Sequence, residues 1–142
     1  MKLEEIQILW DKDSIIDNTE LARESLKVPD LYNTYLKIYS QERLVYVKIN
    51  AEYYRTKKMK WEYYGGKSSA EVYAENPFEL KILRQDLDMY VKADDDMQKI
   101  NFRREYQSQK VEFVEKILKS LERRGFQIKN AIDWEKLCGG PI

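Results

Sequence analysis

The feature that most constrains the fold of this chain is a stretch of 36 residues, 29–64, in which no glycine and no second proline follows Pro29. Pro29 suits the first turn of a helix, where its missing N–H is not needed, and the pair Gly65-Gly66 suits a helix end. At 1.5 Å per residue the stretch predicts a helix of about 54 Å. Its apolar stripe has a three-and-four spacing and consists of Leu31, Tyr35, Ile38, Val45, Ile49, Met59 and Tyr63.

A second long helix of about 45 Å is predicted over residues 95–124. Its apolar residues cover an arc of about 160°, which is wider than the stripe of an ordinary surface helix. Packing inside one subunit explains part of this face, and we expect other copies of the chain to cover the rest. The residues expected to mediate this oligomerisation are Ile100, Val111, Phe113, Val114, Ile117, Leu118 and Leu121.

Shorter helices are predicted before the first long one. Residues 3–11 carry apolar side chains at helical spacing. Asp17 is expected to accept a hydrogen bond from the Glu20 N–H and so to cap a second short helix. This helix should end near Val28, because the residue before a proline avoids the helical conformation.

Between the two long helices we expect a connecting loop, 67–76, and one more helix. Asn76 would cap that helix, with Pro77 at its first position. The side chains expected to point inward from it are Leu80, Leu83, Leu87 and Tyr90. The run Asp94-Asp95-Asp96 is interpreted as favourable negative charge at the start of the second long helix.

The second long helix is predicted to stop at Gly125, in the left-handed conformation, with Phe126 folding back onto it. A short apolar segment and a frayed tail, 139–142, would follow. Together these elements predict an all-α protein, an elongated protomer with two long amphipathic helices and short capping helices. We divide it into an N-terminal helical region, 1–76, and a C-terminal helical oligomerisation region, 77–142.

Composition excludes several function classes. The chain has 142 residues, 25 basic and 25 acidic, with one cysteine and no histidine. A disulfide framework, a Cys/His metal site and an imidazole-based triad are therefore excluded, and we expect no cofactor. No apolar run is long enough to span a membrane, and the polar N-terminus does not resemble a signal peptide, so we expect a cytoplasmic protein.

The sequence Gly65-Gly66-Lys67 resembles the end of a phosphate-binding P-loop. That motif needs a further glycine where Trp61 stands, and a preceding strand where a helix is predicted. We therefore reject it, and no nucleophile–base pair replaces it. The chain is expected not to be an enzyme.

Basic charge is concentrated in residues 43–67, which contain seven basic and two acidic residues, a balance of +5. On a helix, several of its cations and rings share one arc of about 100°. Cations neutralise phosphates and rings stack unpaired bases, so this segment is a candidate for binding single-stranded nucleic acid. The residues of this candidate site are Tyr53, Arg55, Lys57, Lys58, Lys60, Trp61, Tyr64 and Lys67.

Two alternatives stay open for this segment. The lysines could form a solvated face with their stems along apolar surface, and the tyrosines could pack against a neighbouring helix. The chain could also be a non-catalytic helical scaffold or adaptor whose basic patch binds an acidic protein.

The chain resembles the UvsY recombination mediator proteins of T-even-like bacteriophages. The resemblance covers nearly the full length and is carried by four stretches, of which the last two are the most specific. They are Met1-Lys2-Leu3-Glu4-Glu5, Ile16-Asp17-Asn18-Thr19, Lys58-Met59-Lys60-Trp61-Glu62-Tyr63-Tyr64-Gly65-Gly66 and Arg124-Gly125-Phe126-Gln127-Ile128-Lys129.

This resemblance implies an all-helical protein that forms a ring-shaped homo-oligomer of about six or seven subunits through its C-terminal part. It implies binding to single-stranded DNA, displacement of the phage single-strand binding protein, and loading of a RecA-like phage recombinase. The setting would be the cytoplasm of the infected bacterial host. The two basic residues that matter for DNA in the family match Lys58 and Lys60, whereas the helical arc favours Lys57 and Lys60.

Overall fold

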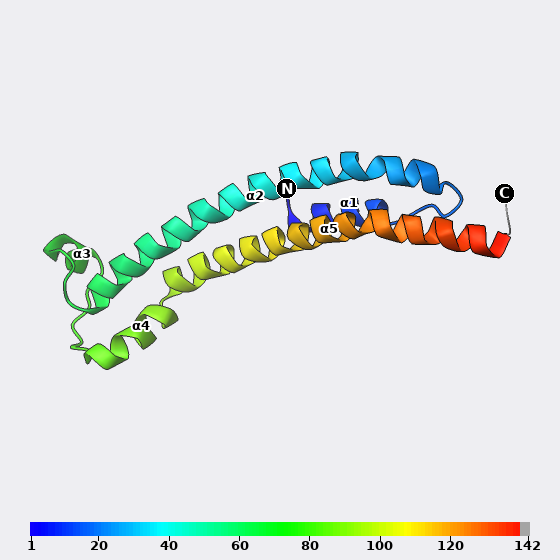
Figure 1. Ribbon diagram of the computed structural model, residues 1–142. Helices are drawn as coiled ribbons and strands as arrows, with labels where there is room; N and C mark the ends of the chain where they lie inside the picture. Colours follow the sequence, from blue (N-terminus) through cyan, green and yellow to red (C-terminus); the bar gives the residue numbers. More distant parts are fainter. Residues whose placement is uncertain (140–142) are drawn as a thin grey trace. The chain divides into compact units, whose positions relative to one another are not determined.

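The computed structural model describes residues 1–139, and every regular element in that range is a helix (Figure 1). The prediction of an all-α protein is confirmed, and the two long helices have 44 and 45 residues. Of the predicted tail, Gly139 is the last residue of a helix and 140–142 lie outside the described residues. The elements are α1 (Leu3–Asp13), α2 (Leu21–Tyr64), α3 (Ala70–Glu75), the 3₁₀ helix η1 (Arg84–Asp86), α4 (Leu87–Ala93) and α5 (Asp95–Gly139).

The chain divides into two compact units. The first consists of residues 1–43 and the chain from 109 onward, and the second of residues 44–108. Both long helices contribute to both units. The predicted boundary between 76 and 77 falls inside the second unit, so the compact units do not coincide with the predicted halves.

The first unit is built from α1, the first part of α2 and the last part of α5. Side chains of all three helices meet in one hydrophobic core, and Ile6, Tyr35, Val114 and Leu121 are completely buried in it. The Tyr35 ring meets Trp10 edge-on at 5.6 Å, and its hydroxyl donates to Asp13 at 2.8 Å. In this unit the apolar stripes that predict these helices therefore pack against one another within one chain.

Buried charges in the first unit are paired. The Glu42 carboxylate accepts from the Lys110 ammonium at 3.2 Å and from the Met1 amino terminus at 3.3 Å. The Arg124 guanidinium donates to the Ser14 carbonyl at 3.2 Å and lies 5.4 Å from the centre of the Trp10 ring. Because an unpaired buried charge is costly, these pairs fix how the helices of this unit pack.

The N-terminal end of α2 differs from the prediction. No separate helix ends at Val28, since α2 begins at Leu21 and continues through Pro29. A proline there removes one hydrogen bond to the carbonyl of Ser25, which is exposed to water. Burial of Leu21 and of Glu24 anchors the turn before it. The cap is also different, because Asp17 accepts from the Thr19 N–H at 2.9 Å.

The C-terminal end of α5 also differs from the prediction. Gly125 has no positive φ and lies inside the helix, which runs on to Gly139. Glycine within a helix costs only about 1 kcal/mol, and the burial of Ile128 one turn later favours continuation. Phe126 does not fold back onto the helix, because its side chain is 73% exposed.

The second unit contains the rest of α2, the short helices and the start of α5. Its buried core consists of Val91, Met97 and Ile100, with Ile49, Tyr53 and Tyr64 of α2 packed against it. The helix predicted to begin at Asn76 begins only at Leu87, where α4 starts. Before it, α3 occupies the predicted loop, and the chain has no regular structure from 77 to 83.

Tertiary contacts explain this difference. The Tyr63 hydroxyl donates to the Asn76 carbonyl at 3.0 Å, and the Phe78 ring packs against the Tyr63 and Tyr64 rings at 5.4 and 5.1 Å. These contacts hold the segment against α2 in a non-helical form. Of the side chains predicted to point inward, Leu87 is buried and Tyr90 half-buried, whereas Leu80 and Leu83 are exposed.

Candidate nucleic-acid interface

The last turns of α2 carry the basic and aromatic residues singled out by the sequence. The helix ends as predicted at Tyr64, and Gly66 takes the positive φ of 75° that closes it. The Lys67 N–H donates to the Glu62 carbonyl at 2.8 Å, and the Gly66 N–H to the Tyr63 carbonyl at 3.3 Å. This glycine-based end directs the chain away from the helix. The side chains of the last turns of α2 form two groups, one that packs inside the unit and one that is exposed to solvent.

The inward group is organised around Asp94. The Lys60 ammonium lies 3.2 Å from the Asp94 carboxylate and 2.9 Å from that of Asp96. The Tyr64 hydroxyl donates to Asp94 at 2.7 Å. The other oxygen of Asp94 accepts from the Met97 N–H at 3.1 Å, so Asp94 caps α5 as well. The prediction that this acidic run favours the start of a helix is confirmed, and the run also holds Lys60.

These contacts shift the pKa values of the three groups. Burial opposes the charge of Lys60, but the hydrogen bonds to Asp96 and Asp94 outweigh it and raise the pKa of the ammonium. Burial likewise opposes the charge of Asp94, but hydrogen bonds from Tyr64, the Met97 N–H and Lys60 lower its pKa overall. Burial and the bond to Asp94 raise the pKa of the Tyr64 phenol. Lys60 and Asp94 are therefore held in their charged forms, and Tyr64 in its neutral form.

Tyr53 belongs to the inward group too. Its ring packs against the core of the second unit, and the Arg104 guanidinium lies 3.8 Å from the ring centre. The cation–π contact uses the face that a base would otherwise stack on. The structure thus brings Tyr53, Lys60 and Tyr64 together on the side of α2 that packs within the unit.

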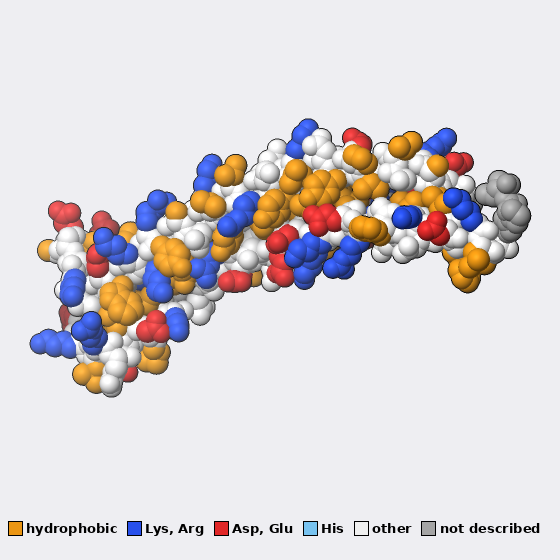
Figure 2. Space-filling model, in the orientation of Figure 1, with side chains coloured by type: hydrophobic (Ala, Val, Ile, Leu, Met, Phe, Trp, Pro, Cys, Tyr) orange, Lys and Arg blue, Asp and Glu red, His pale blue; other side chains and the backbone are white. Residues whose placement is uncertain are grey.

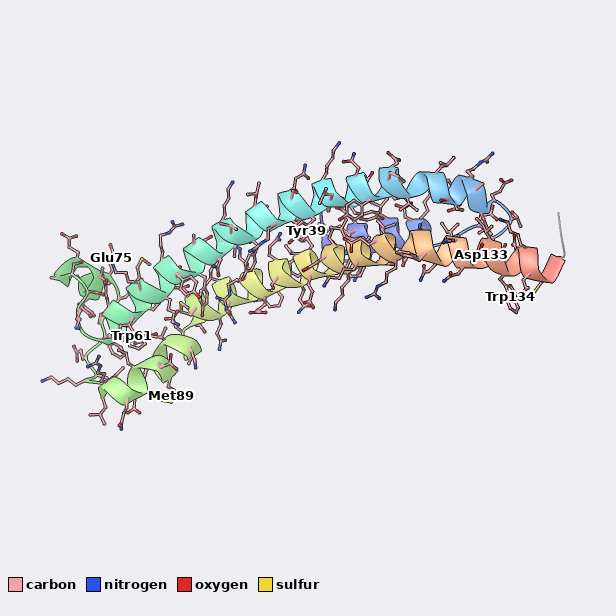
Figure 3. The ribbon with its side chains drawn as sticks, viewed as in Figure 1. Tyr39, Trp61, Glu75, Met89, Asp133 and Trp134 are labelled. Carbon is pink, nitrogen blue, oxygen red and sulfur yellow. The ribbon has the colours of Figure 1, made fainter. Side chains whose placement is uncertain are left out.

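The outward group consists of side chains exposed to solvent. Arg55, Lys58 and Lys67 are exposed, and the Trp61 ring, labelled in Figure 3, is 40% exposed. The Lys58 ammonium has one ion pair, to Glu62 at 3.9 Å, and its side chain is 79% exposed. Lys57 is half-buried. Among residues 1–139, neither Arg55 nor Lys67 takes part in an ion pair.

Charge on this part of α2 is sorted by exposure. Between residues 44 and 67 the residues classed as exposed and charged are all basic, and the side chains of the acidic Glu52 and Glu62 are 47% and 43% exposed. Glu52 pairs with Arg103 at 3.2 Å, and Glu62 with Lys58. Figure 2 shows Lys and Arg side chains interleaved with hydrophobic ones over the part of α2 that leads to α3. Most of the basic residues that give this segment its excess of positive charge are therefore exposed.

An open hollow of about 820 Å³ lies beside the end of α2. Lys60, Lys67 and Ser69 line it together with all three residues of the acidic run. Its lining mixes both signs of charge, which weakens its attraction for a phosphate backbone. The exposed side of α2 is the better candidate for binding nucleic acid.

Comparisons with known proteins identify the family of this chain. A family model described as "Recombination, repair and ssDNA binding protein UvsY" matches residues 9–141. This chain belongs to the UvsY family. The recombination protein uvsY of Enterobacteria phage T4 is 26% identical over 140 residues, which are 99% of each chain.

Solved structures of a UvsY protein have the same fold. The bacteriophage T4 recombination mediator protein UvsY in lattice type II is 26% identical, with a TM-score of 0.87 over 99% of both chains. In lattice type IV the TM-score is 0.78 over 96% of this chain and 98% of that one, again at 26% identity. UvsY proteins are thus recombination, repair and single-stranded-DNA-binding proteins, and the resemblance read from the sequence is confirmed.

The residues predicted to mediate oligomerisation pack inside one chain, whereas we expected other copies of this UvsY chain to cover part of their face. Val111, Val114, Ile117, Leu118 and Leu121 are buried within the first unit, where Phe113 is partly buried, and Ile100 is buried within the second. One chain therefore covers this face by itself, and its width does not require another copy. Their role in assembly stays a prediction.

The site predicted from the sequence leaves out two exposed residues of α2, Tyr54 and Lys48, of which Lys48 was counted only in the charge balance. Both lie seven positions from residues that the predicted site includes, Arg55 and Trp61, and this spacing could have revealed them. In the part of the chain that the structure describes, no group of three acidic, His or Cys side chains could hold a metal ion. No helix there combines the length and the apolar character of a membrane span.

Proposed function

We propose that this chain is a recombination mediator. It binds single-stranded DNA as a homo-oligomer and promotes loading of a RecA-like recombinase onto strands covered by single-strand binding protein. The observation that supports this most directly is the distribution of charge between residues 44 and 67, where the exposed charged residues are all basic and both acidic residues are paired with a basic side chain. Such a surface attracts a phosphate backbone, and it occurs in a chain of a single-stranded-DNA-binding family.

The proposed DNA contacts come from the outward group, Arg55, Lys58, Trp61 and Lys67, with Lys57 beside them. Tyr53, Lys60 and Tyr64 act as positioning residues that fix the end of α2 on α5. This division follows from their partners, since the Lys60 charge is already opposed by two carboxylates at 2.9 and 3.2 Å.

Assembly multiplies this surface in the proposed mechanism. One subunit makes only a few contacts with a strand, but a ring of about six or seven subunits repeats them at high effective concentration. The ring would compete for phosphates held by the single-strand binding protein and so expose DNA to the recombinase. No catalytic step is required, and the setting is the cytoplasm of the infected host.

A binding titration tests the first part of this proposal. Fluorescence anisotropy of labelled oligo-dT should show binding to the purified full chain that weakens steeply with salt, because counterions are released. The double variant Arg55→Ala/Lys58→Ala should bind more weakly, whereas Lys129→Ala, an exposed lysine of the first unit, should bind as the wild type does. Absence of binding at low salt would refute the proposal and favour a scaffold that meets an acidic protein.

A loading assay tests the second part. A RecA-like recombinase should show a shorter lag in its DNA-dependent ATPase on strands covered by single-strand binding protein when this chain is added. The double variant should leave the lag long. If the wild-type chain binds DNA but never shortens the lag, it binds single strands without acting as a mediator.

A further inference from the structure

A row of exposed apolar and aromatic residues runs along α2. Val47, Tyr54 and Trp61 are spaced seven residues apart and are 51%, 57% and 40% exposed. Residues at this spacing drift by only about 20° per step, so the three lie on one line along the helix. The centres of the Tyr54 and Tyr53 rings are 5.2 Å apart and the ring planes are nearly perpendicular, at 81°.

A row of cations runs parallel to this line. Lys48 and Arg55 each follow a residue of the apolar row by one position, which places them about 100° around the helix. Both are exposed, and within residues 1–139 neither forms an ion pair. Ala51 and Lys58 lie between the two rows, and the small side chain of Ala51 leaves room there.

We infer that a single strand of DNA lies along this outer face, with one base stacked on Tyr54 and one on Trp61. The phosphates between them contact Arg55 and Lys58, and a phosphate on the far side of Tyr54 contacts Lys48. This inference rests on the proposed single-strand binding and adds two residues to it, Lys48 and Tyr54. Tyr54 and Trp61 are about 10.5 Å apart along the helix axis.

The chemistry of the two rows favours an unpaired strand over other occupants. In a duplex the base faces are stacked on each other, so exposed rings have nothing to bind there, whereas unpaired bases offer a π-face to each ring. An identical face of a second copy, related by a two-fold axis, would place Lys48, Arg55 and Lys58 opposite like charges.

The test compares strands with and without bases. Oligo-dT and an abasic phosphodiester strand of equal length are titrated against the wild-type chain, Tyr54→Ala, Trp61→Ala, the double alanine variant, and the ring-retaining variants Tyr54→Phe and Trp61→Phe. Phe102→Ala removes an exposed ring of α5 as a control. Light scattering of each variant reports its assembly state.

Each alanine variant should bind oligo-dT at least about fivefold more weakly, with an unchanged salt slope, because a stacked base and not a phosphate contact is lost. The phenylalanine variants should retain most of the affinity, and Phe102→Ala all of it. The wild type should prefer oligo-dT to the abasic strand, and the double alanine variant should bind the two equally. Trp61 fluorescence should be quenched by oligo-dT.

Three outcomes would overturn the inference. Wild-type affinity in the alanine variants would place the strand elsewhere while leaving single-strand binding intact. Equal affinity of the wild type for abasic and natural strands would exclude base stacking. A smaller assembly in the alanine variants would make this face a contact between subunits. Failure of the wild type to bind any strand would instead refute the proposed function itself.

Discussion

Lys58 and Lys60 lie two positions apart in the sequence, on opposite sides of the end of α2. The Lys58 side chain is 79% exposed, and its one ion pair is long, at 3.9 Å. The Lys60 side chain is 20% exposed and is held by two carboxylates at 2.9 and 3.2 Å. The same contrast separates Tyr54, whose ring is exposed, from Tyr64, whose ring is packed and whose hydroxyl is bonded.

The comparison teaches that residue type alone does not assign a binding role. A phosphate that approached Lys60 would have to replace Asp94 and Asp96, and the exchange of one oxyanion for another yields little net free energy. A phosphate that approaches Lys58 displaces mainly water and counterions. The two faces should therefore respond differently to substitution, the inner one in stability and the outer one in DNA binding.

The largest contrast should come from the two tyrosines. Tyr64→Ala removes a ring that packs against Tyr63, Phe78 and Tyr90, together with the hydrogen bond to Asp94. We expect a loss of about 3 kcal/mol in the free energy of unfolding, measured by urea denaturation. Tyr54→Ala should change it by less than about 1 kcal/mol. Equal losses would mean that the outer ring is also structural.

Asp94 should be the next most sensitive position. Asp94→Ala removes the cap of α5 and leaves Lys60 and Tyr64 without their shared acceptor, so the free energy of unfolding should fall by about 2 kcal/mol. Asp94→Asn should lose less, because asparagine also caps a helix. Asp96 is more exposed, and Asp96→Ala should cost less than about 1 kcal/mol. A neutral effect of Asp94→Ala in denaturation would contradict this account of the inner face.

Variants of Lys58 and of Lys60 should differ in how strongly their DNA binding depends on the salt concentration. Lys58→Ala should flatten the log–log slope of affinity against salt by about 0.7, the value for one phosphate contact with a single strand. Lys60→Met keeps the length of the stem and should leave the slope unchanged while lowering stability. A slope flattened equally by Lys60→Met would show that the strand reaches the inner face.

The smallest effect should be the change in the stability contribution of Asp94 with pH. Because the pKa of Asp94 is lowered from its ordinary value of 3.8, its contribution to stability is present above that pH and is lost as the pH falls through the lowered pKa. In urea denaturation the difference between the wild type and Asp94→Asn should therefore shrink as the pH is brought below about 4. A difference that stays constant with acidification would mean that the charge of Asp94 does not matter.

Much of the fold could be predicted from local patterns. The end of α2 at Tyr64 follows from the glycine pair, and the start of α5 from the acidic run. Local rules failed where contacts distant in sequence outweighed them. Pro29 lies within a helix whose first turn is anchored by the burial of Leu21, and Gly125 lies within a helix that continues to the buried Ile128. The helix start predicted at Asn76-Pro77 does not form, because Tyr63 and Phe78 hold this segment in a non-helical form.

The candidate site could be predicted only in part. The sequence indicated which segment carries the excess of basic residues, because a charge balance of +5 in residues 43–67 does not depend on the fold. The helical arc also grouped Tyr53, Lys60 and Tyr64 correctly as neighbours. It did not predict that these three side chains pack inside the second unit. Angles around a helix relate its side chains to one another and not to the elements that pack on the helix.

By itself the sequence determined that this chain is helical, where its first long helix ends, and which segment carries the excess of positive charge. Those properties depend on residues that are close together along the chain. Only the tertiary structure decided which side of that segment faces solvent. Asp94, Asp96 and Arg104 lie thirty to fifty residues further on, and where they pack is set by burial of the core of the second unit. They cover Tyr53, Lys60 and Tyr64, and Tyr54, Arg55, Lys58 and Trp61 are left for DNA in the binding mode proposed here.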